Sequence, residues 1–341
     1  MHTLWVSMPI LRNIVLGAAR NPDTLERICS QGGITTADLD NPDLRLSLEQ
    51  NCALMDAALQ LSGDPHLGLH IGERTTAGVL GIAGHLMESS EDLLTALQYL
   101  QQYTASFTVI CHFGIKVAGD NAIYTCEPIP IWNDLSPETA RQSVDIAFSG
   151  ALHILRLLTG LPVQPTRAQY RYPRIKDASE HERILGCRPI FNQPSNALLF
   201  TKQDLQHRII GYNRELNNIL IKLLEQKLQE AEENGFVRRV KTIILEGSPV
   251  SFPTLETVAA HMHLSPRTLQ RKLQEEETSF RAISDSVKEE LARNFLSSTN
   301  RTVSQIADRL GYTEQAAFQR AFRQWTGKTP KAYRNEAAKN A

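Results

Sequence analysis

LETVAAHMHLSPRTLQRKLQEE, the run from Leu255 to Glu276, decides how the last third of this chain folds. Its first half has small and apolar residues at the spacing of one helix face. Its second half begins with Ser265 and Pro266, a pair that favours the start of a helix. That second helix would bury Leu269 and Leu273 and expose polar side chains. Two short helices, a tight turn and a polar second helix predict a helix-turn-helix at about 255–276.

The same pattern recurs further along the chain. VSQIADRLGYTEQAAFQRAFRQWTG, at about 303–327, again has apolar residues on a first helix and polar ones on a second. Ala259 and Ala307 are 48 positions apart, whereas Arg271 and Arg320 are 49 apart. We therefore expect two helix-turn-helix units, the second with one more residue in its turn.

The segment between the two units, SFRAISDSVKEELARNFLSS at 279–298, predicts one long helix. Its apolar residues recur at helical spacing: Ile283, Val287, Leu291, Phe295 and Leu296. A helix of about 20 residues is about 30 Å long, close to the ~34 Å of one DNA turn. Such a helix would hold two recognition helices near adjacent major grooves.

The two turns differ at a position where the backbone is expected to have a positive φ. Helix-turn-helix turns often have glycine at a positive φ, and the second unit has Gly311 there. The first unit has His263, which adopts this conformation at some energetic cost. We expect the first motif to tolerate it.

These stretches resemble the tandem helix-turn-helix domain of the AraC/XylS transcription regulators. The most specific part of the resemblance is G-Y-x-x-x-x-x-F-x-R-x-F-R-x-W-x-G-x-(T/S)-P-x-x-Y-R, present from Gly311 to Arg334. Roughly residues 10–210 resemble the arabinose-binding-type effector domain of that family, in SLEQNCALMDAALQLSGDPHLGLHIG, GVLGIAGHLMESSEDLLTALQYLQQY and RILGCRPIFNQPSNALLF. The resemblance implies a transcription activator with a DNA operator, RNA polymerase and a small-molecule effector as partners, and a possible homodimer.

Charge is distributed unevenly behind a net charge of −1. Residues 236–341 contain 17 Lys and Arg against 11 Asp and Glu, whereas the rest contains 19 against 26. The basic balance therefore lies in the part that would contact DNA. The acidic remainder is not expected to bind nucleic acid.

The cysteines and the apolar runs indicate the compartment. The five cysteines lack any C-x-x-C spacing, which favours reduced thiols over a zinc site or a disulfide framework: Cys29, Cys52, Cys111, Cys126 and Cys187. Arg12 interrupts the apolar run near the start, and no run of 18 apolar residues occurs. We expect a cytoplasmic protein without a membrane span, metal or cofactor.

The first two thirds of the chain predict an α+β fold. Apolar periodicity indicates helices within 8–72 and at 90–106, 137–158, 179–185 and 213–234. Strands of an antiparallel sheet are expected at 107–117, 122–128, 168–172, 189–192 and 197–200. The predicted domains are 1–210 for effector binding, 211–235 as a linker or dimerisation helix, and 236–341, all-α, for DNA binding.

The two predicted recognition helices supply candidates for DNA contact. Arginine pairs with guanine and glutamine with adenine in the major groove, so we expect base contacts from Arg267, Gln270, Arg271, Gln315, Gln319 and Arg320. By resemblance, the first three match positions that face bases in the family. Candidates for phosphate contact are Thr254, Ser265, Thr313, Arg323, Lys328 and Lys331. The alternative is that these side chains form only a solvated surface.

The effector site has no motif. Aromatic and histidine residues that could line a pocket are His85, Tyr103, Phe107, His112, Trp132 and Phe148, although residues of these types more often pack in a core. No G-x-S-x-G, H-E-x-x-H or P-loop is present, so no catalytic residue is expected. Two alternatives stay open: a regulator controlled by protein partners or dimerisation without a small ligand, and an enzyme fused to a DNA-binding domain.

Overall fold

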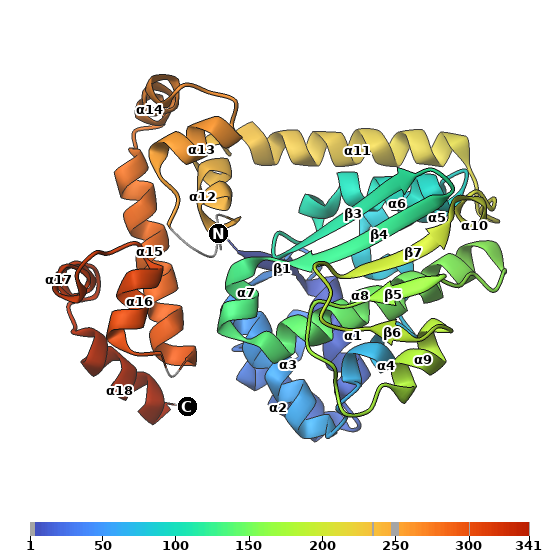
Figure 1. Cartoon of the computed structure of the whole chain (residues 1–341), viewed down its shortest axis with the longest axis horizontal. Helices are drawn as coiled ribbons and strands as arrows, with labels where there is room; N and C mark the ends of the chain where they lie inside the picture. Colours follow the sequence, from blue (N-terminus) through green and yellow to red (C-terminus); the bar gives the residue numbers. More distant parts are fainter. Residues whose placement is uncertain (1–3, 234, 247–251, 300, 341) are drawn as a thin grey trace. The chain divides into compact units, whose positions relative to one another are not determined.

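The computed structural model describes residues 4–233, 235–246, 252–299 and 301–340, and the chain divides into two compact units (Figure 1). The first unit comprises Met1–Ile129 and Pro137–Gln229, and the second comprises Pro130–Ser136 and Glu230–Ala341. The first unit mixes helices and sheets, and the second is helical. Both predicted fold classes are confirmed.

A five-stranded sheet forms the centre of the first unit. Its strand order is β3 (Cys111–Ala118), β4 (Asn121–Pro128), β7 (Ala197–Thr201), β5 (Arg167–Gln169) and β6 (Pro189–Ile190). The tight turn between β3 and β4 places Gly119 at φ +59°, a conformation that favours glycine. The expectation of a purely antiparallel sheet was wrong, because β5 and β6 pair in parallel.

A second, two-stranded sheet was not expected. β1 (Trp5–Ser7) pairs with β2 (Arg45–Ser47). β2 lies within 8–72, where only helices were expected. Three residues are too few to show a strand period. The expected helices around them are confirmed: α1 (Met8–Ala18), α2 (Pro22–Gln31) and α3 (Leu48–Ser62), with the 3-10 helix η1 (Ala37–Asp40) between α2 and β2.

Aromatic packing fills the space between the sheet and the longest helix of the first unit, α8 (Pro137–Thr159). Phe148 of α8 is fully buried, with its ring centroid 6.1 Å from that of Tyr124 on β4 and 5.3 Å from that of Tyr170. The other elements of this unit are α4 (Leu67–Gly72), η2 (Ala77–Leu80), α5 (Ile82–Glu88), α6 (Leu93–Gln102), η3 (Thr104–Ser106), α9 (Ser179–Leu185), α10 (Lys202–Leu205) and α11 (Arg214–Glu233).

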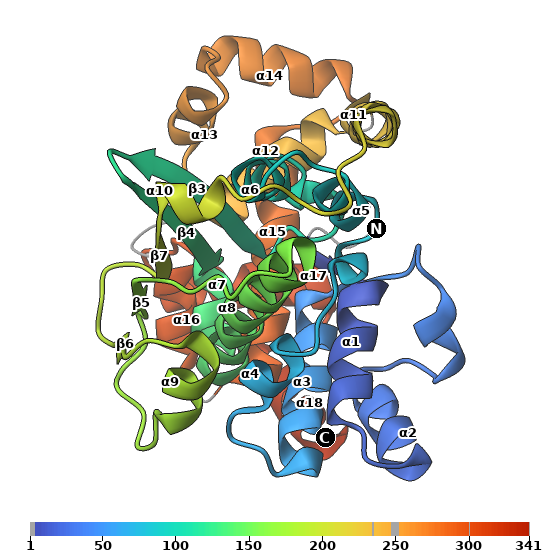
Figure 2. The same ribbon diagram turned by 90° about the vertical axis from the view of Figure 1, so that its right-hand side faces the viewer.

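Two glycines let α4 lie against α8, and Figure 2 shows the two helices adjacent. A Cβ on Gly72 would lie 1.8 Å from Ser149 Oγ and 2.7 Å from Gly150 N. A Cβ on Gly68 would lie 2.4 Å from the backbone oxygen of Gln142. The approach of these backbones therefore depends on the absence of a side chain at Gly68 and at Gly72.

The helix α11 has two apolar faces. On the inner face, Asn217 is buried and its side chain lies 3.4 Å from Leu86 O and 3.3 Å from Ser89 Oγ. Leu224 is also buried on this face. On an adjoining face, apolar side chains remain exposed: Leu216 at 43%, Ile219 at 62% and Leu223 at 39%.

The second unit is built on α15 (Phe280–Ser298), and Figure 1 shows the two helix-turn-helix pairs near its opposite ends. One pair is α13 (Leu255–His261) with α14 (Pro266–Glu275), and the other is α16 (Val303–Arg309) with α17 (Gln315–Thr326). The apolar residues predicted for the linking helix are all buried. The extra residue is confirmed, because 262–265 separate the first pair and 310–314 the second. The unit also contains α7 (Pro130–Leu135), α12 (Phe236–Glu246) and α18 (Pro330–Asn340).

The aromatic residues of the tail pattern pack on one another. The ring centroids of Tyr312 and Phe318 are 5.7 Å apart, those of Phe318 and Phe322 are 5.8 Å apart, and Phe322 lies 5.5 Å from Tyr333. This chain of rings connects the second turn, α17 and α18. The pattern is specific because four positions must supply rings to one small core.

The described residues contain no helix with the length and apolar content of a membrane span. Within the same residues, no group of three His, Cys, Asp or Glu could hold a metal ion. The cysteines are free thiols, and those of Cys111 and Cys126 approach to 3.1 Å between β3 and β4.

The contact between α4 and α8 predicts that two glycine substitutions have different effects. Gly72→Ala should lower the free energy of unfolding by about 1–3 kcal/mol, because the new methyl group overlaps α8. Gly150→Ala is the matched control, because its Cβ would meet nothing closer than 3.6 Å and alanine favours a helix by up to about 1 kcal/mol. Urea unfolding of both variants measures the difference, and equal stability of the two would contradict the close packing.

Candidate nucleic-acid interface and ligand cavity

The start of α14 is fixed by its cap and its apolar side. Ser265 accepts a hydrogen bond from the backbone N–H of Thr268 at 3.1 Å, and Pro266 occupies the first helical position. Leu269 and Leu273 are fully buried. The remaining face therefore points to solvent and carries the first three predicted base-contacting residues together: Arg267, Gln270 and Arg271.

Arg271 has a partner on its own helix. Its guanidinium lies 2.5 Å from the carboxylate of Glu275, and both side chains are more than half exposed. An exposed pair of this kind contributes at most about 1 kcal/mol, so DNA phosphates or bases can displace it. In the described part of the chain, Arg267 and Gln270 make no side-chain hydrogen bond or ion pair.

The second recognition helix, α17, exposes a similar face. Phe318 and Phe322 are fully buried on its inner side. The predicted side chains on the outer side are all exposed: Gln315, Gln319, Arg320 and Arg323. The helix begins after Glu314, which makes no capping hydrogen bond with its side chain. The two recognition helices therefore share an exposed polar face but differ in how their N-termini are capped.

The predicted phosphate contacts lie on several elements. Thr254 and Ser265 cap α13 and α14, and their hydroxyl groups accept hydrogen bonds from Thr257 N and Thr268 N. Thr313 is exposed in the second turn, and Lys331 is exposed on α18. Lys328 forms an ion pair with Glu336, so it is partly neutralised in the free protein.

The two turns adopt the expected backbone conformation. His263 has φ +54° and Gly311 has φ +75°. A Cβ on Gly311 would also lie 2.9 Å from the Cβ of Phe252. Glycine therefore serves both conformation and packing in the second turn, whereas the first turn accepts the strain of a histidine.

The six residues expected around an effector pocket occupy different environments. Tyr103, Phe107 and Phe148 are buried in the hydrophobic core, as the alternative reading required. His112 is exposed on β3, and Trp132 is buried on α7. His85 is exposed and hydrogen-bonded to Glu88. None of the six lines the cavity described next.

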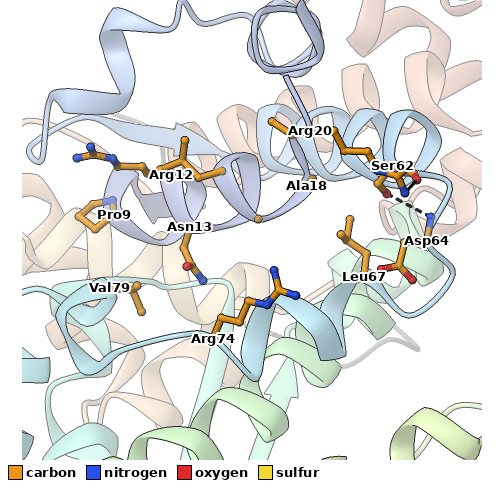
Figure 3. Close-up of a pocket in the computed structure, with 13 residues that line it drawn as sticks. Pro9, Arg12, Asn13, Ala18, Arg20, Ser62, Asp64, Leu67, Arg74 and Val79 are labelled. Atoms are coloured by element: carbon orange, nitrogen blue, oxygen red, sulfur yellow. Dashed lines mark hydrogen bonds between the residues drawn. The ribbon is translucent and has the colours of Figure 1, made fainter. Parts of the chain in front are cut away.

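A cavity of about 570 Å³ lies in the first unit beside α1 (Figure 3). Its walls come from α1, from the turn between α3 and α4, and from the segment that follows α4. Sequence reasoning identified none of its lining residues as a ligand contact: Pro9, Arg12, Asn13, Leu16, Gly17, Ala18, Ala19, Arg20, Ser62, Asp64, Leu67, Arg74 and Val79. No short motif connects them, because they come from three separate parts of the chain.

A polar chain leads from this cavity toward α9. His70 Nδ1 lies 2.6 Å from the carboxylate of Asp64, and its Nε2 lies 2.9 Å from that of Glu180. Burial lowers the pKa of His70, but the hydrogen bonds to both carboxylates outweigh burial and raise it above its ordinary value. Hydrogen bonds from Arg183 and then from His70 lower the pKa of Glu180 to about 2.

A buried carboxylate lies behind this chain. Asp145 of α8 is fully buried and accepts hydrogen bonds from the Tyr172 hydroxyl at 2.6 Å and from Arg141 at 3.0 Å. His181 Nε2 lies 3.2 Å from the same carboxylate. Burial, followed by the charge of Asp145, raises the pKa of Tyr172 well above its ordinary value. This network joins α8 and α9 and was not foreseen, because its members are far apart in sequence.

Comparisons with known proteins match both units. A family model described as the arabinose-binding domain of AraC transcription regulators matches residues 24–209, and a helix-turn-helix domain model matches residues 258–336. The ornithine utilization regulator of Pseudomonas aeruginosa is 30% identical, over 87% of this chain and 86% of the relative. The transcriptional regulator VqsM of the same species is 36% identical, over 79% and 83%. The crystal structure of the transcriptional regulator CdpR, also from P. aeruginosa, has 23% identity and a TM-score of 0.43, over 92% and 97%.

Proposed function

Because this chain belongs to the AraC family of DNA-binding transcription regulators and has that family's N-terminal effector-binding domain, we propose that it is an activator that binds its operator in response to a small molecule. The observation that carries the proposal is the pair of exposed polar recognition helices held by one linking helix. A helix of 19 residues is about 28 Å long. This length suits two adjacent major grooves on one side of a duplex.

Base contacts would come from the exposed faces of α14 and α17. Arg267 and Arg271 present guanidinium groups that match the two acceptors of guanine, and Gln270 matches the donor and acceptor of adenine. On α17 the corresponding candidates are Gln315, Gln319 and Arg320. The exposure of these side chains supports the assignment, because the free protein leaves their donors accessible to bases.

Phosphate contacts would set the register of the protein on DNA. The candidates are Thr254, Ser265, Thr313, Arg323, Lys328 and Lys331. The excess of Lys and Arg over Asp and Glu in residues 236–341 supports this assignment, because contacts between positive side chains and phosphates give DNA affinity that does not depend on sequence.

A second copy of the chain is the proposed partner for the outer face of α11. The inner face of this helix packs on the first unit, whereas Leu216, Ile219 and Leu223 form an exposed apolar stripe. Helical spacing of three and four residues places them on one side. Two such stripes from two copies would bury each other in a symmetric contact.

Activation would follow from contact with RNA polymerase in the cytoplasm, as the family resemblance implies. Transcription in vitro from a promoter that carries the operator tests this part of the proposal. Added protein and effector should raise the amount of transcript, and a decrease would assign a repressor instead.

Removal of one base-contacting arginine should weaken specific binding more than nonspecific binding. We expect Arg271→Ala to cost about 1–3 kcal/mol on the operator and to relax selectivity at one base pair. Arg281→Ala is the matched control, because Arg281 is also an exposed arginine with an ion pair one helical turn away, but it lies on α15. Gel-shift titrations with operator and random DNA measure both affinities. Equal losses on the two DNAs would assign Arg271 to phosphate contact.

The spacing of the two recognition helices predicts the footprint on DNA. Each copy of the protein should protect two major-groove segments about 10 base pairs apart on one side of the duplex. Methylation protection with the wild-type chain measures this pattern. Protection confined to one groove would contradict simultaneous binding by α14 and α17.

The exposed stripe of α11 predicts a dimer that depends on apolar contact. Ile219→Glu should shift the chain toward the monomer, because it places a charge at the centre of the stripe. Asn218→Glu introduces the same charge at an exposed position that already carries a polar side chain and should leave the assembly unchanged. Sedimentation equilibrium distinguishes the two, and a monomeric wild-type chain would refute the dimer.

A further inference from the structure

The cavity beside α1 contains more positive charge than its surroundings neutralise. Four charged side chains line it: Arg12, Arg20, Arg74 and Asp64. Arg12 pairs with Asp40 at 3.2 Å, and Figure 3 shows its guanidinium directed away from Arg74. Arg20 donates a hydrogen bond to the backbone oxygen of Ser62 at 2.8 Å. Two of the three arginines therefore already have partners.

The side chain of Arg74 is exposed and has no hydrogen bond or ion pair among the residues that the structure describes. Figure 3 shows its guanidinium between Asn13 and Leu67. The carboxylate of Asp64 forms no ion pair with Arg74: one of its oxygens accepts from His66 N at 2.9 Å, and the other lies 2.6 Å from the ring of His70. The cavity wall therefore presents an exposed guanidinium group that has no protein partner.

The backbone around Arg74 is well ordered by hydrogen bonds. The N–H of Arg74 donates to the backbone oxygen of Ile71 at 3.2 Å. The next residue, Thr75, is buried, and its hydroxyl group donates to the same oxygen at 2.9 Å. A cation on a fixed backbone loses less conformational freedom when it binds a ligand.

Asn13 adds an acceptor to the same wall. Its Nδ2 lies 2.8 Å from Thr75 Oγ1. Because Thr75 gives its one hydroxyl proton to Ile71, it must accept from Asn13, which fixes the orientation of the amide. The Oδ1 of Asn13 then has no donor within the described chain. Pro9, Leu67 and Val79 supply apolar surface nearby.

We propose that this cavity is the effector site and that it binds a small carboxylic acid with a hydroxyl or amino group next to the carboxylate. The planar guanidinium of Arg74 pairs with both carboxylate oxygens. Asn13 Oδ1 accepts from the neighbouring donor, and the apolar residues contact the rest of the molecule. The inference rests on the proposed function, because it names the ligand class of that regulator. One guanidinium without a protein partner suits a carboxylate better than a phosphate dianion, which needs more donors.

Calorimetric titration of the full chain tests the site directly. The probes are the L-amino acids, lactate and malate. Each acid is compared with the corresponding primary amide. We expect at least one acid to bind and its amide to bind roughly tenfold more weakly, because an amide cannot form a charged pair with Arg74.

Variants assign the binding to this cavity. Arg74→Gln should lower the affinity for the acid roughly tenfold. Arg74→Lys retains the charge but not the planar guanidinium group, so it should also lower the affinity. Arg208→Gln is the matched control and should change affinity less than about twofold, because Arg208 is an exposed arginine paired with Glu91 and does not line the cavity. Thermal unfolding of each variant without ligand confirms that it is folded.

Several results would overturn the inference: no acid of the panel binds, an acid binds Arg74→Gln as tightly as the wild type, or an amide binds as well as its acid. Tighter binding of glycerol 3-phosphate than of any acid would overturn the carboxylate class. Operator binding by the wild-type chain is measured separately in gel shifts. A chain that binds DNA but none of the acids refutes this inference alone, whereas a chain that binds an acid but no DNA refutes the proposed function.

Discussion

The presentation of both recognition helices depends on burial of the apolar side of α15. Ile283 and Val287 lie in the first half of this helix, and Phe295 and Leu296 lie near its end. Each buried side chain of this size contributes about 1.5–3 kcal/mol relative to exposure to water. Because one continuous helix carries both groups, its hydrogen-bonded backbone sets the separation between the two helix-turn-helix units. A flexible linker of the same length would leave that separation undefined.

Local patterns explain why the second unit was predictable. Caps such as Ser265 and Ser279, the positive φ at Gly311 and the ring positions of the tail all act within a few turns of helix. The hairpin of β3 and β4 and the long helix α8 were predictable for the same reason. The predictions that were wrong concern the shortest strands. β2 shows no strand period, and β5 pairs with β6 in parallel. Neither feature leaves a mark in a stretch of two or three residues.

The ligand cavity could not be predicted, because its chemistry arises only after folding. Asn13 lies on α1 and Arg74 follows α4, and Thr75 fixes the orientation of the Asn13 amide through a hydrogen bond across 62 positions of sequence. The aromatic residues that seemed suitable, Tyr103 and Phe148, are needed in the core. Residue type alone does not distinguish a ring that lines a pocket from a ring that fills a core. The distinction requires the neighbours of the ring in space.

The cavity also lies where binding can act on the rest of the first unit. Arg74 directly follows α4, and α4 meets α8 through Gly68 and Gly72, where no side chain can absorb a small displacement. A ligand alters the balance of two conformations only as far as it binds one of them better. Close-packed helices transmit such a preference, because a shift of one backbone requires a shift of the other. The ion-paired chain through His70 to Glu180 gives the same wall a second connection, to α9. The segment that carries Arg74 is therefore connected to α8 by close backbone packing and to α9 by an ion-paired histidine, so a ligand that displaced α4 would also act on these two helices.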